Sequence, residues 1–528
     1  MKIKKIYIPL LIGIAAAIGV LAGASLSNSP ANFGQLNQSR QKISRLINYI
    51  EKDYVDDVNT DSIVDLTVSN ILDNLDPHST YIPKEQYQSV QQNMEGKFVG
   101  IGVSFFRIDD TINVIRTIPG GPAERNGILA GDKILYADEE PLFGNGKSTN
   151  DITSLLKGQK GSEVELTIKR PDQSELKKVN LERGEVPLIS VDAGFKVAQE
   201  LGYIKVNRFA KSTYSEFNAQ LKDLVEQDVK GLIIDLRDNG GGFLDQAIDI
   251  CDELLPDEEP ILITKSRNGE RETTYAGNSG MFQEKPIYIL INKRTASASE
   301  IVAGAIQDND RGTIVGRRSF GKGLVQREMK LGDGSAVRLT IARYYTPTGR
   351  SIQRPYDLGE ENYFNQYARR GESGELVSED SIPVNDSLRY QTPEGDTVYG
   401  GGGIVPDIFV PQDTIPINKE IDFMYNGGVM SRFIFDQLNK NRAYYQKLDE
   451  KDLMSRNAIS DTLVDEFSKY LEEFNFEYDF EPVEYELKNA LNATLAEQLI
   501  NKELATKIKL QNDQMIQKVI QDFSNRLK

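Results

Sequence analysis

Cysteine, histidine and tryptophan are almost missing from this sequence of 528 residues, which has one cysteine, one histidine and no tryptophan. The lone Cys251 allows no intramolecular disulfide and no cysteine-based zinc site. The lone His78 excludes a metal centre built from several histidines, and a Ser-His-Asp or Cys-His enzyme would depend on that one residue. The sequence has 79 acidic residues and only 62 lysines and arginines, which gives a net charge of −17. Because phosphate binding requires clustered lysine and arginine, this acidity argues against a nucleic-acid partner.

Charge is also missing from the stretch 6–26, which follows three lysines within the first five residues. A mostly apolar run of this length can span a bilayer as a helix, so residues 1–26 are expected to form a membrane anchor. A cleaved secretory signal is the alternative, because Ala22-Gly23-Ala24 offers a small-residue cleavage site. Since the basic flank stays inside in both cases, the rest of the chain is expected in the cell envelope, on the periplasmic side of the inner membrane.

The remaining sequence changes its pattern several times. Residues 27–95 are expected to be helical, and residues 96–185 have the short strands and turns of a small separate domain. Residues 186–411 alternate β-branched runs with helical stretches, which indicates an α/β layer. Within them, 354–400 is polar and turn-rich and is expected to be an exposed insertion. Residues 412–528 contain no glycine after Gly428 and are predicted to be helical.

A serine-rich segment, Asn292 to Glu300, follows a strand-like run and opens a helical pattern. Ser297 and Glu300 have the S-x-x-E spacing of a capping box, so a purely structural helix cap is one interpretation. The other is a nucleophile at a strand-to-helix turn. There, the next backbone N–H and the helix N-terminus can stabilise an oxyanion.

Two glycine-rich segments accompany this serine. Gly316 to Gln326 matches the first part of a phosphate-binding loop, but Gly323 stands where Ser or Thr would hold Mg²⁺. An exposed lysine, Lys322, in a glycine-rich turn is the simpler interpretation. Asp235 to Gly242 follows a buried strand, and its three glycines either form a tight turn or present N–H groups to a ligand.

Together, the three segments suggest a serine enzyme whose base is a lysine. A serine nucleophile needs a base, and His78 could supply it only from a distant, helical segment. A lysine can act as the base when burial lowers its pKa enough to leave a neutral amine. Pairs of serine and lysine are an established variant of the catalytic triad.

With these residues, the chain resembles the carboxyl-terminal processing proteases, also called tail-specific proteases. The resemblance spans roughly residues 40–411 and rests on four motifs, at 236–242, 295–300, 319–326 and 403–407. It implies that Ser297 is the nucleophile and Lys322 the base, and that Gln326 hydrogen-bonds and orients the lysine. The implied oxyanion donors are the backbone N–H groups of Ala298 and Gly241, with Gly240 as the alternative glycine. Ser299 is the rival nucleophile. Asp308 is either a supporting residue of the site or, as expected here, a solvated acid at a helix end.

Residues 96–185 resemble the PDZ domain that these proteases carry. The loop Gly100-Ile101-Gly102-Val103 would capture a C-terminal carboxylate with its N–H groups, and the adjacent strand would pair with the incoming peptide. The turn at Pro119 to Ala123 resembles the one that leads into a short helix of this domain.

The resemblance implies a multidomain α+β protein. Its expected parts are a helical N-terminal segment, a PDZ domain, a crotonase-like α/β protease core and a helical C-terminal segment of unknown role. The expected function is that of an envelope serine endopeptidase that recognises protein C-terminal tails and cleaves with a Ser-Lys dyad, without a metal or organic cofactor. His78 is assigned a structural role.

The expected partners are protein or peptide substrates with exposed C-terminal tails, and the membrane through the N-terminal segment. A homo-oligomer and an adaptor are further candidate partners. Two alternatives belong to other classes of protein: a non-catalytic PDZ scaffold that binds peptides, and a ligand carrier built on the same crotonase-like layer.

Overall fold

The computed structural model describes residues 33–528 except 109, 145, 172, 278–279, 414–415 and 456–457. The chain divides into two compact units, Met1–Leu75 and Asp76–Lys528. The expected anchor or signal, residues 1–26, lies outside the described residues. In the part of the chain that is described, no helix combines the length and apolar character that a membrane crossing requires.

The described part of the first unit consists of helices α2 (Phe33–Asp53) and α3 (Thr60–Asp73). Asn59 caps α3, since its side chain accepts a hydrogen bond of 3.2 Å from the Ser62 N–H. This capping satisfies one of the unpaired donors at the helix start. The helices expected within 27–95 are thus present in this unit, whereas residues 80–82 of the same predicted region form a strand, β1 (Thr80–Ile82).

The second unit is built around a sheet of six strands in the order β10-β11-β12-β15-β16-β21. The strands from β11 to β21 are parallel, and β10 is antiparallel to β11. Their bounds are Ala193–Ala198 (β10), Leu201–Lys205 (β11), Gly231–Asp235 (β12), Ile287–Ile291 (β15), Thr313–Gly316 (β16) and Ile408–Phe409 (β21). In β12 and β15 every residue is buried, as expected for parallel strands covered on both faces.

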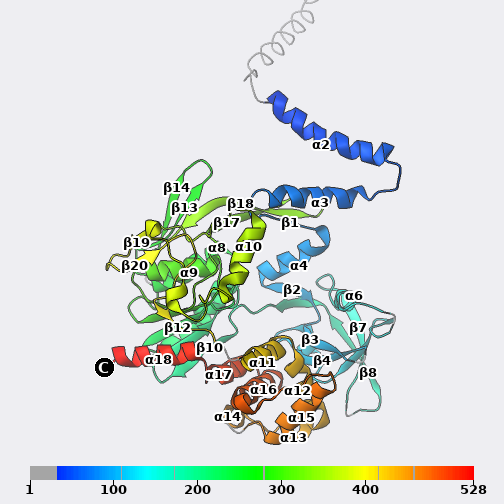
Figure 1. Ribbon diagram of the computed structural model, residues 1–528. Coiled ribbons are helices and arrows are strands. Elements are labelled where there is room, and N and C mark those ends of the chain that lie inside the picture. Colours follow the sequence, from blue (N-terminus) through cyan, green and yellow to red (C-terminus); the bar gives the residue numbers. More distant parts are fainter. Residues whose placement is uncertain are drawn as a thin grey trace, which may run out of the picture. The chain divides into compact units, whose positions relative to one another are not determined.

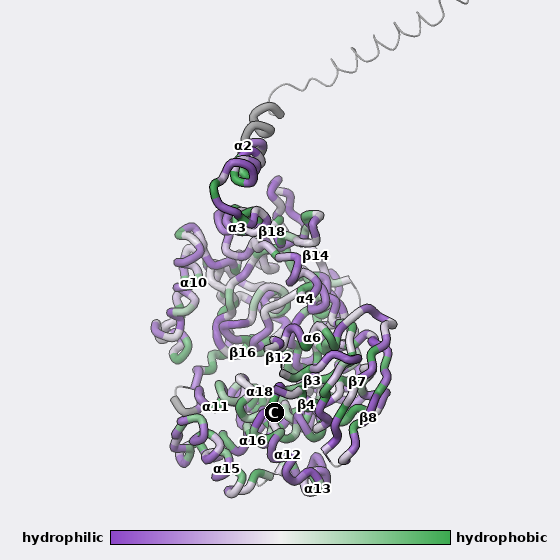
Figure 2. The backbone as a smooth tube through the Cα atoms, turned by 90° about the vertical axis from the view of Figure 1, so that its right-hand side faces the viewer, coloured by the Kyte–Doolittle hydropathy of each residue, from purple (hydrophilic) through white to green (hydrophobic). Residues whose placement is uncertain are grey.

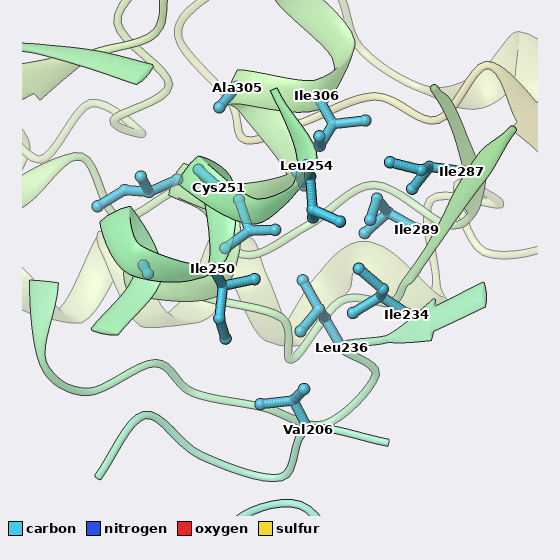
Figure 3. Close-up of a cluster of buried hydrophobic side chains, with 14 of the residues drawn as sticks. Val206, Ile234, Leu236, Ile250, Cys251, Leu254, Ile287, Ile289, Ala305 and Ile306 are labelled. Carbon is cyan, nitrogen blue, oxygen red and sulfur yellow. The ribbon is translucent and has the colours of Figure 1, made fainter. Parts of the chain in front are cut away.

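Helices α7 (Thr213–Glu226), α8 (Leu244–Leu254) and α9 (Ala298–Asp308) cover one face of this sheet. Figure 3 shows how their side chains meet those of the strands: Ile234, Ile287 and Ile289 lie against Ile250, Leu254 and Ile306. Cys251 belongs to this cluster, and burial raises the pKa of its thiol far above the usual range. The cysteine is therefore a packing residue rather than a reactive one.

A second, antiparallel sheet lies beside the first and carries part of the site. Strand β18 (Ala336–Tyr345) pairs with β1 (Thr80–Ile82), β13 (Pro260–Ser266) and β17 (Leu324–Lys330). Strand β14 (Arg271–Tyr275) completes it next to β13. The loop that contains Lys322 leads directly into β17.

The PDZ region forms its own sheet in the order β3-β4-β5-β7-β8. The strands are Val103–Ile108 (β3), Thr111–Thr117 (β4), Lys133–Ala137 (β5), Glu163–Lys169 (β7) and Leu176–Glu182 (β8), with α6 at Thr149–Leu156. Hydropathy alternates along β7 (Figure 2). The apolar side chains of this strand are buried in the domain's own core. Strands β2 (Lys97–Gly100) and β9 (Gly184–Pro187) pair where the chain enters and leaves the domain.

The C-terminal region from Pro416 to the end is helical apart from short connections, as predicted (Figure 1). Its central helix, α16 (Glu484–Leu499), is largely buried among the others, so it shows no clear apolar stripe. The surrounding helices are α11 (Pro416–Asn426), α12 (Val429–Lys440), α13 (Arg442–Tyr445), α14 (Glu450–Met454), α15 (Asp461–Glu472), α17 (Lys502–Leu510) and α18 (Gln514–Arg526).

Candidate active site

Ser297 lies at the turn between strand β15 and helix α9. Its backbone has φ 56° and ψ −117°, a conformation that residues other than glycine rarely adopt. Its N–H donates a 2.9 Å hydrogen bond to Glu300 Oε2, which is the expected half of the capping box. A strained serine between a strand and a helix is typical of enzymes that expose a nucleophilic hydroxyl at this position.

Glu300 does more than cap the helix. Its fully buried carboxylate also accepts hydrogen bonds from Ser319 Oγ at 2.5 Å, from the Gly321 N–H at 2.6 Å and from the Lys322 N–H at 2.8 Å. Burial raises the pKa of Glu300, while these donors favour its ionised form. One carboxylate thus joins the turn of Ser297 to the loop of Lys322. From the sequence, only the capping role of Glu300 could be predicted.

Tyr344 makes a second link between the same two segments. Its hydroxyl, on strand β18, lies 3.1 Å from the Ser297 carbonyl oxygen and 2.8 Å from the Lys322 carbonyl oxygen. The side chain is 1% exposed, so both contacts are shielded from water. Sequence reasoning missed Tyr344, because only the folded sheet brings it to the site.

Lys322 Nζ donates to Gln326 Oε1 at 2.7 Å, and Gln326 Nε2 donates to the His78 carbonyl oxygen at 2.6 Å. Burial, aided by the positive charge of Arg338, lowers the pKa of Lys322 to about 8, against the opposing effect of Asp76 and Glu300. Among the described residues, no hydrogen bond joins Lys322 Nζ to Ser297 Oγ. The structure therefore brings the two segments together and pairs the lysine with Gln326.

The glycine loop after strand β12 lies against the same turn. Gly241 has φ 97°, and a Cβ there would lie 2.8 Å from Ser297 Cβ and 2.9 Å from the Ala298 nitrogen, so only glycine fits. The Gly241 N–H donates to Asn239 Oδ1 at 2.9 Å, whereas the exposed Gly240 donates its N–H to no acceptor in the described part of the chain. Ala298 is the first residue of α9.

Ser299, the rival nucleophile, is completely buried, and its Oγ donates to the Asn239 carbonyl oxygen at 3.0 Å. Asn239 also accepts the Ala296 N–H at 3.0 Å. These contacts give Ser299 a place in the packing between the helix and the glycine loop.

The prediction for Asp308 was wrong. It is fully buried instead of solvated, and it forms an ion pair of 2.6 Å with the fully buried Arg350. Asp308 also accepts from the hydroxyl of Thr348 at 2.5 Å. Because the chain returns to the end of α9 only in the folded core, the partner arginine could not be recognised from the helix sequence.

His78 lies beside Lys322 but presents its carbonyl oxygen, and not its ring, to the Gln326 side chain. The ring nitrogen Nε2 pairs with the Tyr363 hydroxyl at 2.9 Å, and the ring packs edge-on against Phe320 and Tyr363. Burial and the nearby Lys322 lower the pKa of His78 to about 4, so the ring is neutral at physiological pH.

The segment 354–400, expected to be exposed, is anchored by buried charges to the loop of Lys322. Arg318 forms two hydrogen bonds, of 2.8 and 2.6 Å, with Glu375, and both side chains are less than 10% exposed. Arg370 donates to the Ser319 carbonyl oxygen at 2.7 Å and Arg354 to that of Phe320 at 2.8 Å. Most residues of this segment are exposed, as expected, and the buried arginines and Glu375 are among the exceptions.

The predicted carboxylate loop of the PDZ region connects β2 to β3. Gly100, Ile101 and Gly102 are buried, and Gly102 has φ 80°. The Gly102 carbonyl accepts the Ile118 N–H at 2.9 Å, and that of Ile101 accepts the Ala123 N–H at 2.7 Å. Strand β3 forms the edge of its sheet, and its outer side has no strand partner in the described residues.

Comparison with known proteins places this architecture in a family. Residues 200–357 match the family model of peptidase family S41, and residues 99–182 match the PDZ domain model. Over 346 residues the chain is 34% identical to the carboxy-terminal-processing protease of Bartonella bacilliformis, and the match covers 64% of this chain and 78% of that protein. This chain belongs to the carboxy-terminal processing protease family.

This protease has further relatives. It is 31% identical over 323 residues to the carboxy-terminal processing protease CtpB of Bacillus subtilis, covering 60% of this chain and 66% of that protein. Among solved structures, a photosystem II D1 C-terminal processing protease is 26% identical, with a TM-score of 0.37 and coverage of 71% of this chain and 87% of that one. Residues 421–501 match a family of unknown function, DUF8443.

The comparisons confirm the predicted family, enzyme class and PDZ domain. The protease is a serine peptidase with a PDZ domain, a family S41 core and a helical C-terminal region. A scaffold without enzymatic activity is not favoured.

Proposed function

We propose that this protease cleaves peptide bonds with Ser297 as the nucleophile and Lys322 as the general base. The observation that carries the proposal is the pair of links between the two segments: the buried Glu300 carboxylate and the Tyr344 hydroxyl each contact both. These links hold the serine turn and the lysine loop in a fixed relation, as a nucleophile and its base require. A test is cleavage of a tailed peptide by the Ser297→Ala protein, for which we expect no turnover.

In the proposed reaction, neutral Lys322 takes the proton of Ser297 Oγ as that oxygen attacks the scissile carbonyl carbon. For this step Lys322 Nζ moves from Gln326 to within hydrogen-bond reach of Ser297 Oγ. The C–N bond of the tetrahedral intermediate then breaks as the lysine returns its proton to the leaving amine. Water, deprotonated by the same lysine, then attacks the acyl carbon, the ester bond to Ser297 Oγ breaks, and the lysine returns its proton to that oxygen.

The negative oxygen of the intermediate would be stabilised by the N–H of Ala298 and by one glycine N–H of the 240–241 pair. A Cβ on Gly241 would collide with Ser297, which places this glycine against the serine turn, whereas the Gly240 N–H has no acceptor among the described residues. The Gly241 N–H would donate to the oxyanion after breaking its hydrogen bond to the Asn239 side chain. Both glycines therefore stay candidates for the second donor.

The pH dependence of kcat/KM should report the titration of Lys322. Below its pKa of about 8 the amine is protonated and cannot accept the serine proton, so kcat/KM should fall about tenfold per pH unit. Above this pKa it should level off. Initial rates of peptide cleavage between pH 6 and 10 measure this profile. His78, with its pKa of about 4, is neutral throughout, so an inflection that disappears in His78→Gln would contradict the assignment.

We propose that the PDZ domain holds the substrate by its C-terminal carboxylate, bound by N–H groups of the loop Gly100-Ile101-Gly102-Val103. The free edge of β3 supports this, because an extended peptide can add to it as a further strand. Amidating the C-terminus of a substrate removes its negative charge and should raise KM without changing kcat. Equal KM values for the amidated and free-acid peptides would count against carboxylate capture.

We further propose that the enzyme acts in the cell envelope, on the periplasmic side of the inner membrane. The support is the lysine-rich start followed by the uncharged run 6–26. In intact cells the protein should resist added protease and become sensitive once the outer barrier is opened. N-terminal sequencing of the mature protein separates an anchor, which retains these residues, from a cleaved signal. If the added protease digests this protein only after the inner membrane is broken, the proposed location is contradicted.

A further inference from the structure

The last helix of the chain, α18, packs on the central sheet of the protease, on the face opposite α9. Its apolar side chains are buried against residues of β11, β12, β15 and β16. This helix lies outside the ranges that match the peptidase and DUF8443 models, 200–357 and 421–501. The buried residues of the helix are Met515, Ile516, Val519 and Phe523.

Asp513 caps this helix and also contacts the loop of the candidate oxyanion glycines. Its Oδ1 accepts the N–H groups of Met515 at 2.9 Å and Ile516 at 3.1 Å, which satisfies the helix start. Its Oδ2 accepts a hydrogen bond from Arg237 Nη1 at 2.5 Å. Arg237 immediately precedes the segment 238–241, so one carboxylate links the end of the chain to the glycine loop.

The guanidinium of Arg237 is held between two carboxylates. The Asp235 carboxylate, at the end of β12, accepts hydrogen bonds from Arg237 Nε at 2.9 Å and from Nη2 at 2.6 Å. The Asp513 carboxylate accepts from Nη1. Among the described residues, Nη1 makes one further hydrogen bond, to the Met515 sulfur at 3.8 Å. Because the Arg237 side chain is 15% exposed, water would replace a lost Asp513 contact only in part. Lys205 Nζ fixes the backbone at the same point by donating to the Arg237 carbonyl oxygen at 2.6 Å.

Further along, the loop is fastened to the serine turn. Asn239 Nδ2 donates to the Val206 carbonyl oxygen at 2.9 Å, and the Asn239 carbonyl accepts from Ala296 and Ser299. Asp238, with φ 62°, donates its N–H to Asn292 Oδ1 at 3.1 Å. The glycine loop therefore has one attachment at the nucleophile helix and another, through Arg237, at the C-terminal helix.

We propose that Asp513 is a positioning residue for the protease reaction: through Arg237 it fixes the loop so that a glycine N–H and the Ala298 N–H point at the same oxyanion. The inference rests on the proposed function, since it requires Ser297 to be the nucleophile beside this loop. It gives the C-terminal helical region a part in catalysis. An oxyanion donor must be in place before the reaction, so a loosened loop lowers the rate more than it lowers substrate binding.

The test is the full-length Asp513→Asn variant. Asparagine caps a helix as well as aspartate does, so the variant keeps α18 but loses the charged partner of Arg237. We expect kcat to fall at least about tenfold, less than the roughly 10²–10³-fold cost of removing an oxyanion donor outright, with KM within about twofold of wild type. Asp513→Glu retains the charge and should recover much of the lost kcat.

Asp522→Asn is the matched control. Asp522 lies on the same helix and accepts a 2.7 Å hydrogen bond from the Tyr288 hydroxyl on β15, away from the glycine loop. It should lower the melting temperature about as much as Asp513→Asn and leave kcat unchanged. A wild-type kcat in Asp513→Asn, or an equal loss in Asp522→Asn, overturns the inference. Activity in Ser297→Ala would instead show that the proposed function itself has failed.

Discussion

Replacing Ser297 by alanine is expected to abolish cleavage, with kcat falling about 10⁶-fold to the level that substrate binding and the oxyanion donors alone sustain. Alanine removes the attacking oxygen and keeps the backbone N–H that donates to Glu300. The fold, and binding of a peptide by the PDZ domain, should therefore be retained. Turnover of a tailed peptide measures the loss, and circular dichroism with a peptide-binding assay checks that the protein is folded.

Ser299→Ala is the matched control for this substitution. Ser299 is buried and its hydroxyl donates to the Asn239 carbonyl oxygen, so its loss should cost about 1 kcal/mol of stability and leave substantial activity. The opposite pattern, with Ser297→Ala active and Ser299→Ala inactive, would assign the nucleophile to the rival serine.

Lys322→Arg is expected to be almost as inactive as Lys322→Ala, with kcat at least about 10³-fold below that of the wild type. Arginine retains the positive charge but stays protonated at any ordinary pH, so it cannot accept the Ser297 proton. A lysine whose pKa burial has lowered to about 8 is neutral in about a tenth of molecules at pH 7. The measurement is single-turnover cleavage, which isolates the chemical step from product release.

Gln326→Ala should have a milder effect than either lysine variant. It removes the 2.7 Å hydrogen bond that holds Lys322 Nζ, but leaves the base itself. His78→Gln should retain activity, because the backbone carbonyl of residue 78, and not the ring, accepts from Gln326. A fully active Lys322→Arg protein would exclude lysine as the base.

The sequence was sufficient to predict the parts of the site that are local. Ser297 is preceded by a buried strand and followed by an apolar helix, and Gly240 and Gly241 follow a second buried strand, so both turns could be recognised. The parallel order of these strands then brings the two turns to the same edge of the sheet. A lysine base also required burial to lower its pKa, and burial does lower the pKa of Lys322.

What could not be predicted depends on segments that are distant in the sequence. Glu300 looks like an ordinary cap until the loop 319–322 folds onto it, and Tyr344 contacts the site only through the pairing of β17 with β18. The contact between the polar segment 354–400 and the lysine loop could not be predicted, because Arg318 and Glu375 are 57 residues apart in the sequence. The packing of α18 on the sheet could not be predicted either, because the sequence of an amphipathic helix does not indicate which surface the helix covers.

The central claim, that Ser297 attacks the substrate with Lys322 as its base, is tested most directly by mapping the acyl-enzyme. The purified full-length enzyme is mixed with an activated peptide ester and acid-quenched at short times. The acylated residue is then identified by digestion and mass spectrometry. We expect the acyl group on Ser297, formed at a rate that rises with pH through about 8 and that is lost in Lys322→Arg. An acyl group on any other residue, or an unchanged rate in Lys322→Arg, would contradict the claim.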